Sequence, residues 1–374
     1  MPSHPDFLPT GRPVVGRRRE WGELPPEERL GVAVLGLHEG LTLLVGLRAA
    51  GLCRAVAGCD LSAEKRAAAE EACPGLFVTD DYAAMLARDD VRIVAIYTPD
   101  PYHADHIEAA FRAGKDVLCT KPLINDPADA ERIRRAAKET GRRLMVGQST
   151  RFGEPFLRQR EGFEAGQIGE VELVDAHYVH RMDWYYEKSP WTIEETHWAY
   201  LGLSHPVDLI RWYLGPIAEV HAFGTVSNLA SGYRLPTPDA IVVNLRAENG
   251  RIGRVMGHYG MHELPRARSL IECFLMGSEG TSLARYPELR LTKLVDGVEV
   301  EEDLTLSMSG YYNRHELVGM HYGEFCNYAE YFASCLLSGQ PNSPDLEEGL
   351  ETVATMRAIV ASLESGRVEK VLRI

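Results

Sequence analysis

The sequence predicts a two-domain α/β protein: an N-terminal Rossmann-type domain with a parallel sheet, and a C-terminal α+β domain with a large, mostly antiparallel open sheet. Three observations lead to this fold class. Short apolar segments alternate with helical segments up to about residue 149, as in consecutive βαβ units. Longer segments with alternating polar and apolar residues follow, as in antiparallel strands with one solvated or interface face. The length of 374 residues suits two cores better than one.

We therefore expect an N-terminal arm (1–30), a Rossmann domain (31–149) and a C-terminal α+β domain (150–374), for which the resemblance described below implies substrate binding and oligomerisation. The C-terminal helix could pack back on the Rossmann domain. The arm is rich in Pro and Arg, and we interpret it as either disordered or packed on a neighbour. It lacks the apolar core of a signal peptide.

The strands of the first domain should be short, apolar and buried on both faces. The expected strands are 31–36, 55–60, 93–98, 116–120 and 144–147. The helices between them have recognisable ends. Ser62 is an N-cap candidate, and Gly114 ends another helix. A third helix has Asp126 as its cap, Pro127 in its first turn and Gly141 as its stop.

The second domain should begin with a helix over 152–165 and continue with longer strands. The expected strands are 171–180, 219–226, 240–247, 251–258, 269–277 and 298–306. One helix (205–215) interrupts them, and two helices (323–339 and 344–366) close the chain.

Composition excludes several classes of protein. The net charge of −14 argues against a nucleic-acid partner, because a phosphate backbone needs a basic face. No apolar run approaches the length that spans a bilayer. Seven cysteines without a C-x-x-C motif are typical of a reduced, cytoplasmic protein. His177 and His180 fall on opposite faces of one strand, and no cluster has ligand spacing, so no metal site is expected.

The segment LGLHEGL (35–41) follows the first strand, where a dinucleotide-binding turn is expected. The fingerprint G-x-G-x-x-G is incomplete here, because His38 and Leu41 occupy its second and third glycine positions. Gly36 and Gly40 can still relax the turn. His38 then either points away or uses its ring on the phosphates.

Asp60 ends the second expected strand and is the candidate for the ribose of the cofactor. A carboxylate there would accept the ribose hydroxyls of NAD and repel the extra phosphate of NADP. Leu61 follows where an arginine would suit NADP, so NAD is expected in preference to NADP. The alternative is that Asp60 only caps the helix that starts near Ser62.

The segment YTPDPYHADHIEAAFRAGKDVLCTKPL (97–123) is the most specific motif. It resembles ATPNxxHxxxAxxALxAGKHVxCEKP, which is typical of the glucose–fructose oxidoreductase, inositol dehydrogenase and MocA family. Segments 78–96, 146–152, 202–215 and 338–359 also fit that family. The resemblance implies a Rossmann domain, a C-terminal domain with an open sheet, NAD(P) as cofactor, and a homodimer or homotetramer formed through that sheet.

The resemblance also implies an acid/base pair, Lys121 and His205. A lysine beside the cationic nicotinamide ring should have a lowered pKa and can exchange a proton with a substrate hydroxyl. The alternatives are a surface Lys-Pro turn and a histidine that caps the next helix. Two positions depart from the family, Thr120 where glutamate is common and Leu201 where aspartate is common. They leave a Lys–His pair.

The cofactor is expected to contact the turn, the end of the second strand and the loop on the nicotinamide side. The expected cofactor-binding residues are Gly36, Leu37, His38, Glu39, Gly40, Asp60, Thr98, Pro99, Asp100, His103, Lys121 and Gln148.

Aromatic residues concentrate in 182–202, between the first long strand and the helix of His205. Aromatic faces suit the CH faces of sugars, and neighbouring polar groups could bind hydroxyls. The alternative is a loop packed into a subunit interface. Arg151 could orient a polar substrate or pair with a carboxylate, and Asp208 could hold His205 or the helix start. The substrate-binding candidates are Arg151, Trp184, Tyr185, Trp191, His197, Trp198, Tyr200 and Asp208.

Three functions fit these observations. The first is an NAD(P)-dependent oxidoreductase that moves a hydride between nicotinamide and a hydroxyl-bearing carbon of a sugar, cyclitol or related polyol. The second is a glycoside-cleaving hydrolase or lyase on the same scaffold that retains NAD. The third is a non-catalytic binding or scaffold protein, suggested by His38, Leu41, Thr120 and Leu201.

Overall fold

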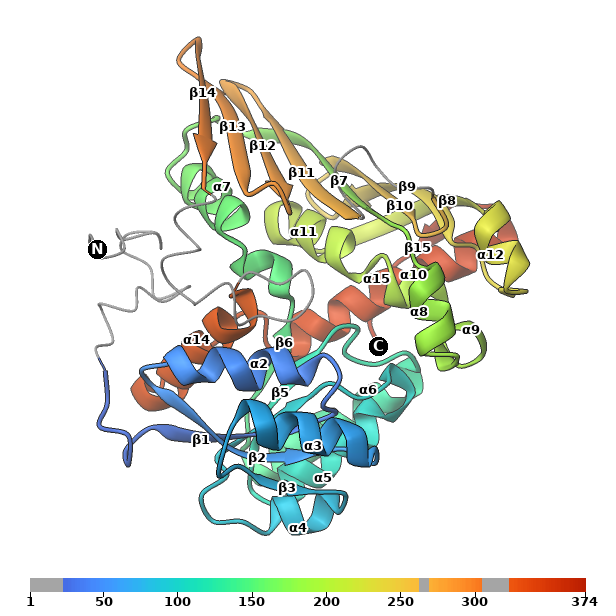
Figure 1. The fold of residues 1–374 in the computed structure, drawn as a ribbon. Helices are drawn as coiled ribbons and strands as arrows, with labels where there is room; N and C mark the ends of the chain where they lie inside the picture. Colours follow the sequence, from blue (N-terminus) through green and yellow to red (C-terminus); the bar gives the residue numbers. More distant parts are fainter. Residues whose placement is uncertain (1–22, 262–268, 305–322) are drawn as a thin grey trace. The chain divides into compact units, whose positions relative to one another are not determined.

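The structure is a computed structural model, and it describes residues 23–261, 269–304 and 323–374 (Figure 1). Contacts divide the chain into two compact units. Of the described residues, unit 1 contains 23–123, 128–154 and 323–348, and unit 2 contains the rest. Most of the predicted arm lies outside the described residues. Its last part is tied to unit 1, because Leu24 N–H donates to the Gly51 carbonyl (3.0 Å) and Leu30 N–H to the Leu52 carbonyl (2.8 Å).

Unit 1 contains a parallel sheet with the strand order β3-β2-β1-β4-β5-β6 (Figure 1). The strands are β1 (Leu30–Leu35), β2 (Cys53–Cys59), β3 (Phe77–Thr79), β4 (Ile93–Ile96), β5 (Asp116–Thr120) and β6 (Leu144–Gly147). The strand order reverses at β1, and the carboxyl ends of β1 and β4 flank the point where open α/β sheets bind ligands. The sequence pattern does not predict β3, which is three half-buried residues long.

Helices and short 3₁₀ turns connect these strands. They are α2 (Gly40–Gly46), η1 (Leu47–Ala49), α3 (Ala63–Ala72), α4 (Tyr82–Leu86), η2 (Asp100–Tyr102), α5 (His103–Arg112), η3 (Pro127–Asp129), α6 (Ala130–Thr140), η4 (Ser149–Phe152) and α14 (Glu324–Ser338). Ser62 caps α3 by accepting from Lys65 N–H (3.4 Å), as predicted. Gly141 ends α6 in the left-handed conformation, also as predicted. The predicted cap at Asp126 is wrong, because Pro127 begins a 3₁₀ turn that precedes the helix.

Helix α14 belongs to unit 1 by its contacts, although it lies in the sequence region assigned to the second domain. Its Glu330 side chain is buried. The carboxylate accepts hydrogen bonds from the backbone N–H groups of Gly51, Leu52 and Cys53 at 2.9–3.2 Å. These bonds satisfy a buried charge and fix the chain where it enters β2.

Unit 2 contains a nine-stranded sheet with the order β14-β13-β12-β11-β7-β10-β9-β8-β15, in which only β7 and β10 pair in parallel. The strands are β7 (Val171–His180), β8 (Ile217–Thr225), β9 (Ala240–Ala247), β10 (Ile252–His258), β11 (Ser269–Gly277), β12 (Gly280–Tyr286), β13 (Arg290–Val295), β14 (Val298–Asp303) and β15 (Glu369–Lys370). The predicted fold class is confirmed. Strands β12 and β13 were not predicted. Their outward positions carry polar residues such as Arg285 and Thr292.

Helices cover one face of this sheet. The helices of the second unit and its borders are α7 (Glu154–Glu164), α8 (Asp183–Lys188), α9 (Trp191–Glu194), α10 (Trp198–Leu201), α11 (Ser204–Leu214), α12 (Asn228–Gly232) and α15 (Leu346–Ser365). Figure 1 shows α11 and α15 along this face. Helix α11 packs so close to β10 that a Cβ atom on Gly253 would lie 3.2 Å from Ile210. The opposite face carries Asp175 and His177 of β7 and the exposed Phe223 and Val242.

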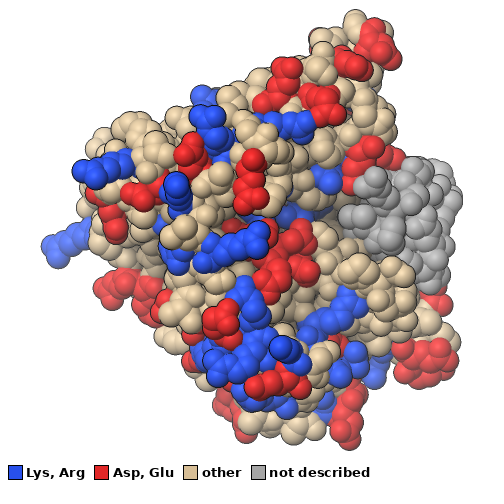
Figure 2. All heavy atoms as spheres, turned by 180° about the vertical axis from the view of Figure 1, so that it is seen from behind, with Lys and Arg blue, Asp and Glu red and all other residues tan. Residues whose placement is uncertain are grey.

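Charged side chains of both signs are mixed on the surface seen in Figure 2, and the described cysteines form no disulfides. Figure 2 shows acidic and basic side chains intermingled over the face seen from behind. All cysteines are thiols, and all but Cys73 are buried. Within the described ranges, no helix is long and apolar enough to cross a membrane, and no His, Cys, Asp and Glu side chains cluster as metal ligands.

Candidate active site

The turn after β1 keeps the geometry of a dinucleotide site through Gly36. This residue has φ +90°, and a Cβ atom would lie 2.7 Å from the backbone of Tyr97. Only glycine avoids both the strained φ and this clash. Its N–H donates to the Cys59 carbonyl (2.8 Å), which joins the end of β1 to the end of β2.

Gly40 takes over the packing role that the fingerprint gives to its third glycine. A Cβ atom on Gly40 would lie 2.4 Å from Val34 of β1, so glycine allows α2 to lie close against the strand. The Leu37 side chain is buried. His38 and Glu39 are partly exposed in the turn, with His38 Nε2 3.6 Å from a carboxylate oxygen of Glu39. The turn therefore presents a polar side chain, His38, at the second glycine position of the fingerprint, with Glu39 beside it.

Asp60 lies at the end of β2 and holds the turn. One carboxylate oxygen accepts from Leu37 N–H (2.8 Å), and the other accepts from Ser62 N–H (2.8 Å). The side chain is 12% exposed, with Lys65 Nζ at 4.0 Å. Leu61 is 88% exposed. Asp60 thus supports the turn and the residue that caps α3, whereas the cap itself is Ser62.

The carboxyl ends of β4 and β5 lie side by side, because Ile96 pairs with Cys119 in the parallel register. Thr98 and Asp100 follow β4, and Lys121 follows β5. Asp100 is buried, and the Thr98 hydroxyl lies 3.0 Å from His106 Nδ1. The sheet thus brings together three predicted residues from two separate parts of the motif.

Lys121 has the electrostatic character of an acid/base residue. Burial of its side chain lowers the pKa to about 8, since an ammonium group loses hydration there. The carboxylates of Asp100 and then Glu39 oppose this effect by favouring the charged form. A lysine with this pKa exchanges its proton near neutral pH.

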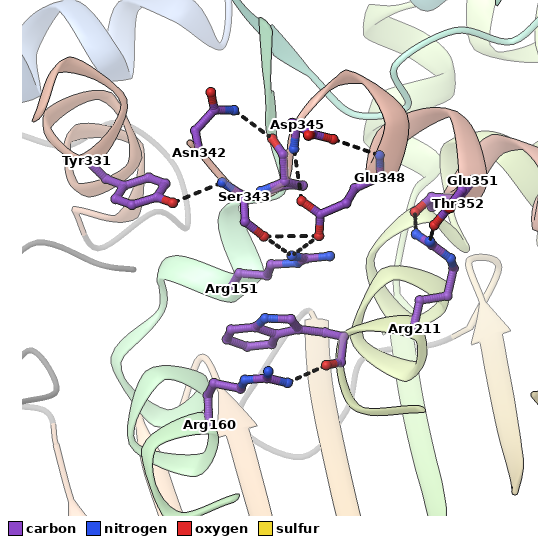
Figure 3. A network of polar contacts seen from close by, with 12 residues as sticks. Arg151, Arg160, Arg211, Tyr331, Asn342, Ser343, Asp345, Glu348, Glu351 and Thr352 are labelled. Atoms are coloured by element: carbon purple, nitrogen blue, oxygen red, sulfur yellow. Dashed lines mark hydrogen bonds and ion pairs between the residues drawn. The ribbon is translucent and has the colours of Figure 1, made fainter. Parts of the chain in front are cut away.

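Arg151 is buried and pairs with a carboxylate of its own unit (Figure 3). Its Nη1 lies 3.2 Å from both Ser343 Oγ and Glu348 Oε1. Glu348 and Asp345 also bond each other's backbone N–H, as in a capping box at the start of α15. Burial raises the pKa of Glu348, but Arg151 and the hydrogen bonds outweigh it and hold the pKa below its ordinary value. Of the two roles predicted for Arg151, the structure shows the ion pair.

His205 is the second residue of α11 and is buried. The N-cap position of α11 is Leu203, so the alternative role of His205 as a helix cap is wrong. Its ring lies edge-on to Tyr178, with centroids 5.8 Å apart, and Tyr178 in turn contacts His180 at 6.1 Å. Asp208 is buried one turn further along the helix.

Tyr178 and His180 were not among the predicted site residues. The alternation of VELVDAHYVH does predict that both residues lie on the β7 face opposite His177. The missing information was which face α11 covers, and this depends on tertiary packing.

The aromatic segment divides into an accessible part and a core part. Trp184, Tyr185 and Trp191 are half-buried and contact each other in series, at 5.3 and 6.3 Å between ring centroids. Trp184 also lies 6.0 Å from the His180 ring. Trp198 is fully buried, and its Nε1 donates to the Thr192 carbonyl (3.1 Å). The accessible three rings continue the series of aromatic contacts that starts at His205.

Two further candidates have structural contacts. His197 caps α10 by accepting from Ala199 N–H at Nδ1 (3.0 Å), and burial lowers the pKa of its ring to about 4. Tyr200 is buried, and burial raises its pKa to about 12. Gln148 is also buried, at the residue before η4.

Comparison with known families decides the classification. Residues 43–148 match the model described as "Oxidoreductase family, NAD-binding Rossmann fold", and residues 156–282 match the "GFO/IDH/MocA C-terminal domain". The chain belongs to the GFO/IDH/MocA family of oxidoreductases. It is an enzyme with an NAD-binding Rossmann domain. The described residues fit NAD, because Gly36 and Gly40 keep the turn and Asp60 lies where the ribose is expected.

The curated relatives include inositol 2-dehydrogenases that match this chain over different lengths. The chain is 28% identical over 328 residues to the inositol 2-dehydrogenase of Gluconacetobacter diazotrophicus, which covers 85% of this chain and 88% of that protein. It is 44% identical over 94 residues to the inositol 2-dehydrogenase of Rhizobium meliloti, or 24% of this chain and 28% of that protein.

The fold is also that of solved dehydrogenases. A levoglucosan dehydrogenase in complex with NADH and levoglucosan superposes with a TM-score of 0.79 at 19% identity, over 92% of this chain and 100% of that chain. An oxidoreductase from Agrobacterium radiobacter in complex with NAD⁺, L-tartaric acid and magnesium gives 0.78 at 21% identity, over 92% and 98%. At these identities the comparison supports the fold.

Proposed function

We propose that this enzyme transfers a hydride between NAD and a hydroxyl-bearing carbon of a cyclitol, a sugar or a related polyol. One observation carries the proposal: Lys121, with a pKa lowered to about 8, follows β5 in the NAD-binding unit. Relatives named inositol 2-dehydrogenase support a cyclitol or sugar substrate.

The proposed cofactor residues follow the switch point of the unit 1 sheet. Gly36, Leu37 and Gly40 form the backbone that approaches the pyrophosphate, and His38 and Glu39 contribute polar side chains there. Asp60 accepts the ribose hydroxyls, and its two backbone hydrogen bonds orient it for this role. The proposed nicotinamide-side residues are Thr98, Pro99, Asp100, His103, Lys121 and Gln148.

Apart from Arg151, which belongs to unit 1, the proposed substrate residues lie in unit 2. Trp184, Tyr185 and Trp191 offer half-buried aromatic faces to the CH groups of a polyol ring. His205 meets the same series of rings through Tyr178, and Asp208 supports its helix. Arg151, His197, Trp198 and Tyr200 act as supporting residues, because their observed contacts are with the protein itself.

The proposed chemistry needs a proton acceptor with a pKa near neutrality. NAD accepts the hydride when it is bound. Lys121, in its neutral form, takes the proton from the substrate hydroxyl, and His205 shares that proton during oxidation. The reverse reaction uses the protonated lysine as the acid.

Replacement of Lys121 by alanine tests the proposal. Turnover of myo-inositol and related polyols with NAD should fall by roughly 10²–10⁴-fold, while NAD still binds in a calorimetric titration. The unsubstituted enzyme should form one NADH for each molecule of polyol that it oxidises. Full activity of the alanine variant, or sugar release without net NADH, would reject the assigned role in favour of another chemistry.

The pairing of Lys121 with His205 needs its own test. Groups that act as a unit are not additive, so Lys121→Ala and His205→Ala together should lower kcat no further than the more damaging single change. Two losses that simply multiply would show that the residues act independently.

We also propose a homodimer or homotetramer formed through the face of the unit 2 sheet opposite α11. Phe223 and Val242 pair across β8 and β9 there and are 64% and 41% exposed. Native mass spectrometry should show dissociation when Phe223 is replaced by aspartate. Leu337→Asp, at a similarly exposed apolar residue of α14, is the control, and it should leave the subunit count unchanged.

A further inference from the structure

His103, the first residue of α5, has a fully buried ring with contacts at both nitrogens. Nε2 lies 2.8 Å from the Thr98 carbonyl oxygen. Nδ1 lies 2.9 Å from the Pro122 carbonyl oxygen and 3.2 Å from that of Leu123. The ring therefore joins the backbone that follows β4 to the backbone that follows β5.

These contacts restrict what the ring can do. A carbonyl oxygen only accepts hydrogen bonds, so each ring nitrogen that bonds one must carry a proton. A neutral ring donates one of the two bonds, and a protonated ring donates both. Burial outweighs the bonds to the Thr98, Pro122 and Leu123 carbonyls and holds the pKa of His103 below its ordinary value, which favours the neutral ring. The neutral ring thus donates at one nitrogen, and its other nitrogen only lies against a carbonyl oxygen.

The two segments that the ring contacts are close in sequence to Asp100 and Lys121. Thr98 precedes the buried Asp100 by two positions, and Pro122 is covalently bonded to Lys121. A shift of the 121–123 segment would move the lysine relative to Asp100 and expose its side chain to water. Position matters here, since a misplacement of about 1 Å can cost roughly 10²-fold in rate.

We infer that His103 is a positioning residue for Lys121: its ring, carried by α5, donates from Nδ1 to the Pro122 carbonyl, holds the 121–123 segment against the helix and keeps the lysine in its desolvated place. The inference rests on the proposed role of Lys121 in catalysis, but this clamp itself can be measured without substrate. His103 thereby acts on the nicotinamide-side loop through its backbone.

The direct test measures the protonation of Lys121. Acetic anhydride labels neutral amines, so the labelling rate of the Lys121 peptide across pH, followed by mass spectrometry, gives the pKa of that lysine. The midpoint should lie at about 8 in the unsubstituted enzyme. In His103→Leu the bond to the Pro122 carbonyl is lost, the lysine becomes hydrated, and the labelling midpoint should rise toward the ordinary value of 10.5.

Two conservative variants separate the Nδ1 contact with Pro122 from the Nε2 contact with Thr98, and they also serve if His103→Leu does not fold. We call these two contacts the Pro122 arm and the Thr98 arm. Asparagine places an amide donor near the position of Nδ1, and glutamine places one near the position of Nε2. His103→Asn should keep the Pro122 arm and a midpoint near 8, whereas His103→Gln should lose that arm and show a raised midpoint. His106→Leu is the matched control, because His106 lies on the same helix and bonds the Thr98 hydroxyl. Its labelling midpoint should stay near 8.

The kinetic readout distinguishes positioning from general damage. His103→Leu should lower kcat by roughly 100-fold and change KM for NAD much less, with the acidic limb of the pH profile displaced to higher pH. A folded His103→Leu with an unchanged labelling midpoint would overturn the inference. So would unchanged midpoints in both amide variants, or a rise in the asparagine variant alone. If no polyol is oxidised even by the unsubstituted enzyme, the proposed function fails, and the labelling still decides the clamp.

Discussion

The turn after β1 and the paired loops after β4 and β5 belong to the same proposed cofactor site but are held in different ways. The turn depends on the absence of side chains at Gly36 and Gly40, where backbone and strand approach too closely for a Cβ atom. The paired loops depend on side chains, because His103 and Asp100 are buried and polar. A glycine can therefore allow the close approach from a neighbouring position, as Gly40 does. A buried polar side chain must instead stay where its hydrogen-bonding partners are.

This difference explains why the two motifs look so unequal in the sequence. At 38 and 41 the fingerprint loses two glycines, yet Gly40 allows the close approach of α2 to β1 from a neighbouring position. In the 97–123 segment, His103 has three carbonyl contacts that a different residue could not reproduce. The predictions below test this contrast, from the largest expected effect to the smallest.

The largest effect is expected from Gly36→Ala. A methyl group would force both an unfavourable φ of +90° and a contact of 2.7 Å with the Tyr97 backbone. The strained φ alone costs about 1–2 kcal/mol, and the clash adds to it. Urea unfolding should show a larger loss than for Gly75→Ala, which has φ +87° but open space around its Cβ position. NAD binding should be lost as well. Equal losses in the two variants would mean that the close approach is unimportant.

A smaller effect is expected from Asp60→Ala. This change leaves the N–H groups of Leu37 and Ser62 without their acceptor and removes the proposed ribose ligand. Unsatisfied groups of this kind cost roughly 1–3 kcal/mol. NAD affinity in a calorimetric titration should fall, and the preference for NAD over NADP should narrow because the repelling charge is gone. Asp81→Ala, which caps α4 through a similar side-chain bond, is a control that should leave cofactor preference unchanged.

A moderate shift in pH dependence is expected from Asp100→Asn. The Asp100 carboxylate raises the pKa of Lys121 against the larger effect of burial, so its removal should lower that pKa below about 8. Polyol oxidation needs neutral lysine, and its rate should therefore rise at lower pH than in the unsubstituted enzyme. This direction is opposite to that expected for His103→Leu. Asp105→Asn, an exposed carboxylate paired with Arg132, should leave the profile in place. A shift to higher pH would contradict the assigned role of Asp100.

The sequence predicted the β-strand and α-helix pattern well where burial repeats regularly. Strands β5, β6 and β9 were expected with the observed bounds, because each is bounded by clear turns. The resemblance of segment 97–123 to the family motif also implied that Thr98, Asp100 and Lys121 share one site. The sequence could not show that backbone carbonyls lie at both nitrogens of the His103 ring, or that Trp198 is buried in the core and Trp184 is accessible. Those facts depend on contacts between segments far apart in sequence, which local pattern does not encode.

The smallest effect is expected from His38→Gly, which restores the second glycine of the fingerprint. The side chain is partly exposed and lies 3.6 Å from Glu39, so its removal should alter stability little. If the ring contacts the pyrophosphate as proposed, NAD should bind several-fold more weakly, with a steeper loss at low pH, where the ring would be charged. Unchanged affinity in His38→Gly would show that the ring points away, and that Gly36 and Gly40 alone make this turn fit for NAD.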